Sequence, residues 1–220
     1  MTHIIGDILD RAKLAAINEL IQANPQVFES GSRTAGWHAK EVKNNQQASG
    51  NVAGAVQVMV ENALLSHPVF QAATQSKQII RLLVSRYQVG MSYGTHIDDP
   101  LMGGIRTDLS FTLFLNDPDA YEGGALTIQA SDGDNEFKLP AGSLVLYATT
   151  ALHHVQKVTR GERLAVVGWV RSFIRNAEDR EMLFDLENVI ASVRLLEANR
   201  ALLDQLLKLR ANLMRKWVED

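Results

Sequence analysis

The spacing of apolar residues at the start of the chain predicts helices. Apolar side chains recur at helical spacing from Ile8 to Ile21, until Asn24-Pro25 ends the pattern. A polar, glycine-containing stretch covers 29–50, and a second helical pattern runs from Val52 to Leu65, with a short continuation after Pro68. These helices are expected to pack against another part of the chain.

From residue 78 the pattern changes to short β-prone segments separated by turn residues. Eight strands are predicted: 78–88, 93–97, 108–115, 125–129, 136–139, 143–148, 153–158 and 163–173. Gly-, Pro-, Asn- and Asp-rich turns separate most of them, as in Asn116-Asp117-Pro118-Asp119 and Glu122-Gly123-Gly124. Eight antiparallel strands in about a hundred residues favour a double-sheet jelly roll, the double-stranded β-helix.

After Arg175 the leucine spacing becomes helical again and continues to Trp217. Two helices covering the barrel explain this stripe, and so does a short coiled-coil seam between two copies of the chain. The expected fold class is therefore α+β. The expected division is a helical support region (1–77), a jelly-roll domain (78–174) and a C-terminal helical segment (175–220).

Composition and charge narrow the possible functions. The 220 residues include 22 Lys and Arg against 25 Asp and Glu, so the chain has no overall basic field for nucleic acid or anionic membranes. There is no cysteine, which excludes disulfides, cysteine-bound zinc and thiol nucleophiles. No apolar run approaches ~18 residues, and no leader is recognisable at Met1. We expect a cytoplasmic protein whose metal, if it has one, is bound by His and carboxylates.

The triplet His96-Ile97-Asp98 is the first candidate for chemistry. Taken alone it is a weak motif, since a turn-end Asp beside a His arises by chance. It ends a predicted strand, however, where residues two apart share a face, so His96 and Asp98 can both point into a barrel mouth. One further His would complete the two-His, one-carboxylate set of non-haem iron(II) oxygenases.

Downstream, only His153 and His154 could supply that ligand, and they point to opposite faces of a strand, so at most one can do so. Arg163 follows at the start of an apolar strand. Burying it without an anion is costly, and its planar fork suits a carboxylate. The alternative is an ion pair with an acidic neighbour at the barrel rim.

Several segments together resemble the bacterial PKHD-type hydroxylases, in the prolyl-4-hydroxylase-like branch of the Fe(II)/2-oxoglutarate dioxygenases. The resemblance covers nearly the whole chain. The segments that carry it are 86–100 (RYQVGMSYGTHIDDP), 106–116 (RTDLSFTLFLN), 121–126 (YEGGAL), 152–155 (LHHV) with 158–163 (VTRGER), 33–36 (RTAG) with 42–47 (VKNNQQ), and 212–217 (NLMRKW).

The resemblance implies a role for each matching residue. The metal ligands would be His96, Asp98 and His153, because in this branch the second His stands ten positions before the basic residue that binds the cosubstrate. Arg163 would hold the distal carboxylate of 2-oxoglutarate. Trp169, six residues later on the same strand face, matches an aromatic found there in related enzymes.

Tyr87 and Tyr93 are candidate contacts to the cosubstrate or to the metal ligands, with ordinary packing as the alternative. The polar loop from Lys40 to Gln47 either closes over a substrate or is solvated surface. Two positions depart from the family pattern: Ala211 stands where a His is expected, and Gly168 where an aromatic is expected.

The resemblance implies an enzyme with one Fe(II) per chain and 2-oxoglutarate as cosubstrate. Oxidative decarboxylation of 2-oxoglutarate would be coupled to hydroxylation of a substrate by dioxygen, with L-ascorbate as reductant. A protein side chain, a free amino acid and a peptide-like siderophore all remain open as substrates, with a link to iron uptake favoured. The alternatives are a cupin-like metal-dependent isomerase or hydrolase, and a non-catalytic iron-binding regulator. Neither a nucleic acid nor a membrane partner is expected, and a homodimer is left open.

Overall fold

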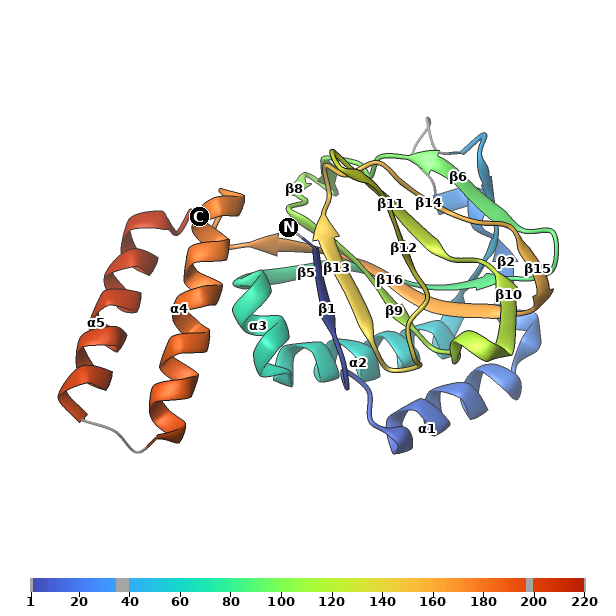
Figure 1. Cartoon of the computed structure of the whole chain (residues 1–220). Helices are drawn as coiled ribbons and strands as arrows, with labels where there is room; N and C mark the ends of the chain where they lie inside the picture. Colours follow the sequence, from blue (N-terminus) through green and yellow to red (C-terminus); the bar gives the residue numbers. More distant parts are fainter. Residues whose placement is uncertain (1, 35–39, 197–199, 220) are drawn as a thin grey trace.

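The computed structural model describes residues 2–34, 40–196 and 200–219. Figure 1 shows two facing sheets, with helices α1 and α2 running beneath the larger one and a helical hairpin at the C-terminal side. The helices of the first part are α1 (Arg11–Gln22), α2 (Gly50–Ser66) and α3 (Pro68–Thr74), and the short 3-10 turns are η1 (Pro25–Val27), η2 (Gly31–Thr34) and η3 (Pro118–Ala120).

The larger sheet has seven antiparallel strands. Their spatial order is β1 (Thr2–Ile5), β13 (Leu144–Ala148), β9 (Leu109–Phe114), β16 (Arg163–Ser172), β5 (Ser76–Tyr87), β4 (Gln46–Ala48) and β2 (Phe28–Ser30). Four of these strands were predicted, namely β5, β9, β13 and β16. Within the sheet they lie side by side in the order β13, β9, β16 and β5, so no two adjacent strands among them directly follow one another in the sequence. This crossing order is what a jelly roll requires.

The smaller sheet faces the larger one. Its order is β12 (Gly133–Phe137), β11 (Leu126–Ala130), β14 (His153–Val155), β6 (Ser92–His96) and β3 (Lys43–Asn44). Two short pairs complete the described strands: β10 (Tyr121–Gly123) with β15 (Val158–Gly161), and β7 (Leu101–Met102) with β8 (Ile105–Arg106). The predicted α+β class with an antiparallel double-sheet core is confirmed.

Two apolar cores lie on opposite faces of the larger sheet. One joins the sheet to α1, α2 and α3, and the other fills the space between the sheets. Alternation along β16 explains the division, because Leu164, Val166 and Val170 belong to the helix-side core. Each such side chain contributes roughly 1.5–3 kcal/mol when fully buried. Arg163 lies on the other face, toward the interior of the jelly roll.

Strands that the sequence pattern did not predict come mostly from the first 50 residues. Strand β1 extends the larger sheet at one edge, and β2 and β4 extend it at the other. The predicted strand 153–158 is divided into β14 and β15 at Gln156-Lys157. Residues 1–77 are thus not helical throughout, since three of their strands belong to the main sheet.

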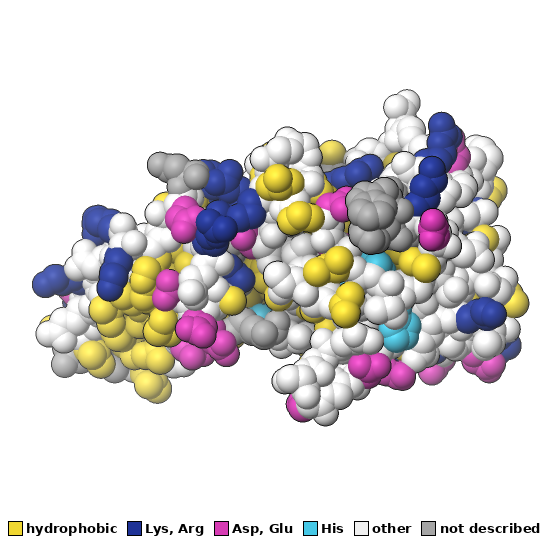
Figure 2. Space-filling model, turned by 90° about the horizontal axis from the view of Figure 1, so that it is seen from above, with side chains coloured by type: hydrophobic (Ala, Val, Ile, Leu, Met, Phe, Trp, Pro, Cys, Tyr) yellow, Lys and Arg dark blue, Asp and Glu magenta, His cyan; other side chains and the backbone are white. Residues whose placement is uncertain are grey.

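The C-terminal segment forms a hairpin of α4 (Ala177–Leu195) and α5 (Arg200–Trp217). Helix α4 packs against α3, and α5 packs against α4. No described residue of α5 is buried. Figure 2 shows hydrophobic side chains gathered on the hairpin, to the left of the molecule. The hairpin therefore lies beside the jelly roll instead of closing over it.

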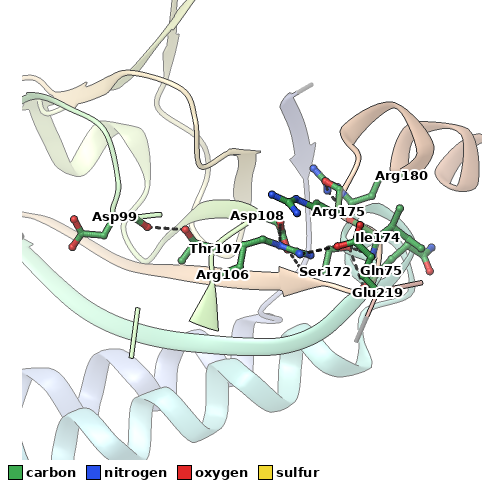
Figure 3. Close-up of polar contacts among 10 residues, drawn as sticks. All are labelled: Gln75, Asp99, Arg106, Thr107, Asp108, Ser172, Ile174, Arg175, Arg180 and Glu219. Atoms are coloured by element: carbon green, nitrogen blue, oxygen red, sulfur yellow. Dashed lines mark hydrogen bonds and ion pairs between the residues drawn. The ribbon is translucent and has the colours of Figure 1, made fainter. Parts of the chain in front are cut away.

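A polar cluster fixes the end of the chain to the jelly roll, as Figure 3 shows. The Asp108 carboxylate accepts hydrogen bonds from Arg106 Nε at 2.8 Å and from the Ser172 amide at 2.9 Å. Arg106 Nη1 also donates to Glu219 at 3.0 Å. Thr107 lies between Arg106 and Asp108 in the sequence. Its hydroxyl donates to the Asp99 carbonyl at 2.7 Å and so holds the segment that follows Asp98.

Candidate metal centre and cosubstrate site

A pocket opens between the two sheets at the end where β6 finishes. The space inside it, counted together with its open mouth, is about 800 Å³. Its walls come from both sheets and include His96, Asp98 and His153. No described helix combines the length and the apolar character that a membrane span needs.

The three side chains that the sequence singled out as ligands meet in this pocket. His96 ends β6 and is paired directly with His153, which begins β14. The Nε2 atoms of His96 and His153 lie 3.9 Å and 3.7 Å from the Asp98 carboxylate. These distances are too long for hydrogen bonds. All three ligand atoms lie within 4.8 Å of one another, close enough for one metal ion to contact them all.

The hydrogen bonds of the two imidazoles fit a metal site. His96 Nδ1 donates to the Gly94 carbonyl at 2.8 Å, and His153 Nδ1 donates to the Ala151 carbonyl at 3.0 Å. Because Nδ1 carries the proton, each Nε2 has a free lone pair that points toward Asp98. Burial, followed by the neighbouring His153, lowers the pKa of His96 to about 4. The His96 ring is therefore neutral at pH 7, as a metal ligand must be.

The carboxylate is also held in place. Ser110 Oγ donates to Asp98 Oδ2 at 2.7 Å and lies 3.1 Å from Thr149 Oγ1. Ser110 engages only the Oδ2 oxygen of the Asp98 carboxylate. Partners of this kind orient metal ligands and raise metal affinity.

His154 lies outside this group. It pairs with Thr127 of β11 and points to the opposite face of the smaller sheet, away from His96. Among the described residues, the one cluster able to hold a metal contains His153 and does not contain His154.

Arg163 begins β16 and is fully buried. Its guanidinium lies 5.1 Å from the ring centre of Tyr87 and 5.4 Å from that of Phe114. Among the described residues none of its three guanidinium nitrogens has a hydrogen-bond partner. A buried cation in this state is costly unless an anion binds to it. The expected alternative, an ion pair at the barrel rim, is not found among the described residues.

Gly124 leaves room for the Arg163 side chain. A Cβ added at Gly124 would lie 3.2 Å from Arg163 Cδ and 3.2 Å from Tyr121 Cε2, and the backbone has a positive φ of +64°. The buried Tyr121 hydroxyl has no hydrogen-bond partner within the described chain either. Burial raises the pKa of Tyr121, and the nearby Arg163 charge opposes this. The Glu122-Gly123-Gly124 turn thus shapes the surroundings of Arg163.

The three aromatic candidates lie in different parts of the pocket. Tyr93 stacks on the His96 ring, with ring centres 3.6 Å apart. Tyr87 is buried beneath Arg163, and burial raises its pKa. Trp169 lines the pocket, and its buried Nε1 has no partner among the described residues. All three contribute to the pocket wall.

Several pocket residues escaped the sequence analysis. Tyr147 packs edge-on against the His153 ring at 5.0 Å, and Arg81 lines the pocket from β5. From Lys43 on, the polar loop is extended, in β3 and β4, and alternate residues Lys43, Asn45 and Gln47 face the pocket. Lys40 is exposed. The spacing of two residues between Lys43, Asn45 and Gln47 is the sequence signal of a strand with one buried face. All three are polar, so a search for alternating apolar residues misses this segment.

The two departures from the family pattern lie away from the ligands. A Cβ at Gly168 would come within 2.5 Å of the Phe111 ring and 2.7 Å of Leu82, so Phe111 already fills the space of the missing aromatic. Ala211 is part of α5. In the motif 33–36, Ala35 and Gly36 lie outside the described residues.

This chain is similar to a known protein family over most of its length. Residues 82–171 match the model of the 2OG-Fe(II) oxygenase superfamily. A PKHD-type hydroxylase of Maricaulis maris is 52% identical over 88% of this chain and 89% of its own length. Another, of Parvibaculum lavamentivorans, is 49% identical over 98% of both chains. A third, of Acaryochloris marina, is 44% identical over the full length of both.

Solved structures share the fold at low sequence identity. A Pseudomonas putida prolyl-4-hydroxylase has a TM-score of 0.55 and 19% identity, covering 78% of this chain and 92% of its own. A Trichoplax adhaerens prolyl hydroxylase, in complex with a hypoxia inducible factor peptide fragment, has a TM-score of 0.57 and 17% identity, covering 83% and 86%. With the relatives above, they support one conclusion: the chain belongs to the PKHD-type hydroxylases, a family of Fe(II)/2-oxoglutarate dioxygenases.

Proposed function

We propose that His96, Asp98 and His153 bind the Fe(II) ion and that Arg163 binds the distal carboxylate of 2-oxoglutarate. The observation that carries this assignment is the paired geometry of the imidazoles, whose Nδ1 protons are held by backbone carbonyls while both Nε2 atoms point toward Asp98. The unpaired, buried Arg163 supports the cosubstrate assignment. The ion, when bound, would supply the site where dioxygen is activated.

The protein's own groups supply binding, orientation and a dry pocket. Ser110 keeps the Asp98 carboxylate in position, and Tyr93 covers one face of the His96 ring. Arg163, between the Tyr87 and Phe114 rings, can offer two parallel N–H groups to a carboxylate in an environment of low dielectric. The cosubstrate is thereby oriented at one end while the substrate reaches the ion from the pocket mouth.

Turnover of 2-oxoglutarate provides the test of this function. With Fe(II) and dioxygen but no added substrate, the wild-type protein is expected to convert 2-oxoglutarate to succinate slowly, as measured by chromatography or NMR. Asp98→Ala is expected to lower this rate by at least about 100-fold, because the metal loses the one anionic ligand that the proposed protein set supplies. An equal rate in the variant would contradict the ligand assignment.

A cupin-like isomerase or hydrolase has no use for the buried cation at Arg163, and a non-catalytic regulator would not turn over 2-oxoglutarate. We propose that the substrate is one of the three kinds left open above. The prolyl hydroxylases named above share the fold at low identity, and their substrate is not carried over to this chain. We further propose a cytoplasmic location, since ferrous iron persists in a reducing compartment. A link to iron uptake and the use of L-ascorbate as reductant complete the proposal.

We also propose that two copies pair through their α4–α5 hairpins. Apolar side chains are exposed there, including Leu195, Leu202 and Leu209. The helices also have opposite charge: acidic residues predominate on α4 and basic residues on α5. An antiparallel arrangement would set α4 of one copy against α5 of the other and bury the exposed leucines.

Sedimentation should then give a mass near twice the 24.3 kDa of one chain. The double substitution Leu202→Glu, Leu209→Glu is expected to yield monomers, whereas Val89→Glu, at an exposed position outside the hairpin, should leave the dimer intact. A wild-type protein that sediments as a monomer would refute this pairing.

We propose a modified version of the division into residues 1–77, 78–174 and 175–220. Residues 78–174 would carry the chemistry. Because β1, β2 and β4 belong to the larger sheet, we expect residues 1–77 to fold together with them as one unit.

A further inference from the structure

One wall of the pocket lies outside the segment that matches the superfamily model. The model covers residues 82–171, which include the proposed ligands and Arg163. The pocket is also lined by Thr34, Lys43, Asn45, Gln47 and Arg81. This wall therefore comes from segments outside the match to the superfamily model. Residues that select a substrate are expected in such a position.

Lys43 brings a cation close to the metal centre. Its Nζ lies 5.1 Å from the ring centre of Tyr93, which itself stacks on His96. The same Nζ donates to Thr34 Oγ1 at 3.2 Å. Burial, and secondarily the charge of Arg81, lowers the Lys43 pKa to about 8, while Asp98 opposes the shift. No described carboxylate lies within ion-pair distance of Lys43.

Arg81 supplies a second cation from the larger sheet. It pairs with Trp169 across the β5–β16 ladder, and Trp169 in turn pairs with Ser110, which holds Asp98. No described acidic residue forms an ion pair with Arg81 either. Apart from the proposed ligand Asp98, the described residues of the lining include one carboxylate, that of Asp99. This part of the pocket thus has two cations, Lys43 and Arg81, against the single carboxylate of Asp99.

Arg81 is far from Arg163 along the strands of the larger sheet. Arg163 pairs with Tyr87 at one end of the β5–β16 ladder, and Arg81 pairs with Trp169 six residues away. At a rise of about 3.3 Å per residue, the two guanidinium-bearing positions are roughly 20 Å apart along the strands. Arg81 therefore lines a different part of the pocket from Arg163, and Lys43 lies beside Tyr93, which stacks on His96.

We propose that Lys43 and Arg81 bind a carboxylate of the primary substrate, which makes the substrate a carboxylic acid. This inference rests on the proposed function. Two charge-assisted hydrogen bonds would hold the acid from opposite walls of the pocket. The substrate would thus be fixed at its charged end while the group to be hydroxylated points toward the metal ligands.

Binding of matched probes tests the proposal without turnover. The protein is loaded with Mn(II) and 2-oxoglutarate, and binding of free amino acids, N-acetyl amino acids and the corresponding N-acetyl amino acid amides is measured by calorimetry and ligand-observed NMR. At least one acid is expected to bind, and its amide to bind about tenfold more weakly or worse, since each charge-assisted bond is worth roughly 1.5–3 kcal/mol.

Lys43→Gln and Arg81→Gln should each weaken binding of the acid by about tenfold or more while leaving 2-oxoglutarate affinity unchanged. Lys43→Arg should largely restore binding of the acid. Lys157→Gln, which removes an exposed charge outside the pocket lining, serves as the control and should change nothing.

The absence of any bound acid, equal binding of acid and amide, or unchanged affinity in Lys43→Gln and Arg81→Gln would overturn the proposal. So would a loss of 2-oxoglutarate affinity in Lys43→Gln, because Lys43 would then serve the cosubstrate. If the wild-type protein binds neither Mn(II) nor 2-oxoglutarate, the proposed function itself fails, and this inference falls with it.

Discussion

Replacing His153 by Ala is expected to lower Fe(II) affinity by more than about 100-fold, whereas His154→Ala should leave it within a factor of a few. Loss of a group that only orients a ligand already costs 10–100-fold in metal affinity, so loss of the ligand itself should cost more. His153 faces His96 across the β14–β6 pair, and His154 points to the other face of the sheet. Anaerobic equilibrium dialysis with Fe(II) measures both variants directly.

The two adjacent histidines make a matched pair of variants, because the same atoms are removed one residue apart. Circular dichroism and thermal unfolding of the metal-free proteins would show whether either variant disturbs the fold. If His154→Ala lost Fe(II) binding while His153→Ala kept it, the choice of the third ligand would be wrong.

Arg163→Met is expected to raise the dissociation constant of 2-oxoglutarate by about 100-fold or more while leaving Fe(II) binding intact. A bidentate, charge-assisted contact to a carboxylate in a buried site is worth several kcal/mol, and each 1.4 kcal/mol is a factor of ten. The Arg163 guanidinium has no partner among the described residues. Titration calorimetry with Mn(II)-loaded protein gives both affinities.

The same variant should not lose stability in the absence of 2-oxoglutarate. Replacing a buried, unpaired cation with an apolar side chain of similar length is often neutral or stabilising. We therefore expect the unfolding temperature of the ligand-free Arg163→Met protein to equal or exceed that of the wild type, and 2-oxoglutarate to raise the unfolding temperature of the wild type alone. A strongly destabilised variant would mean that Arg163 serves the fold and not the cosubstrate.

The central strands of the jelly roll were predictable because one or both of their faces are apolar. Strands β5, β9 and β16 match their predicted ranges closely, since each packs against a core. The first and last parts of the chain were predicted as helical for the same reason, although the position of the hairpin beside the jelly roll was not. The spacing of apolar residues predicts a helix or strand and its buried face. It does not predict which other helices or strands will pack against that face.

Strands β3 and β4 were missed because their side chains that face the pocket are polar. Asn45 and Gln47 are buried, yet nothing in their residue type indicates burial. They line the pocket because its walls must bind polar groups. The candidate site shows the same limit: His96, Asp98, His153 and Arg163 follow a recognisable pattern, whereas Lys43 and Arg81 become visible only when the two sheets are brought face to face.

The most direct test of the metal and cosubstrate assignment is anaerobic addition of Fe(II), then 2-oxoglutarate, to the metal-free protein, followed by visible absorption. We predict a charge-transfer band that requires both additions, that is absent in His153→Ala, and that in Arg163→Met forms only at much higher 2-oxoglutarate concentration. Fe(II) binding without a band would contradict the cosubstrate site, and no Fe(II) binding at all would contradict the ligand set itself.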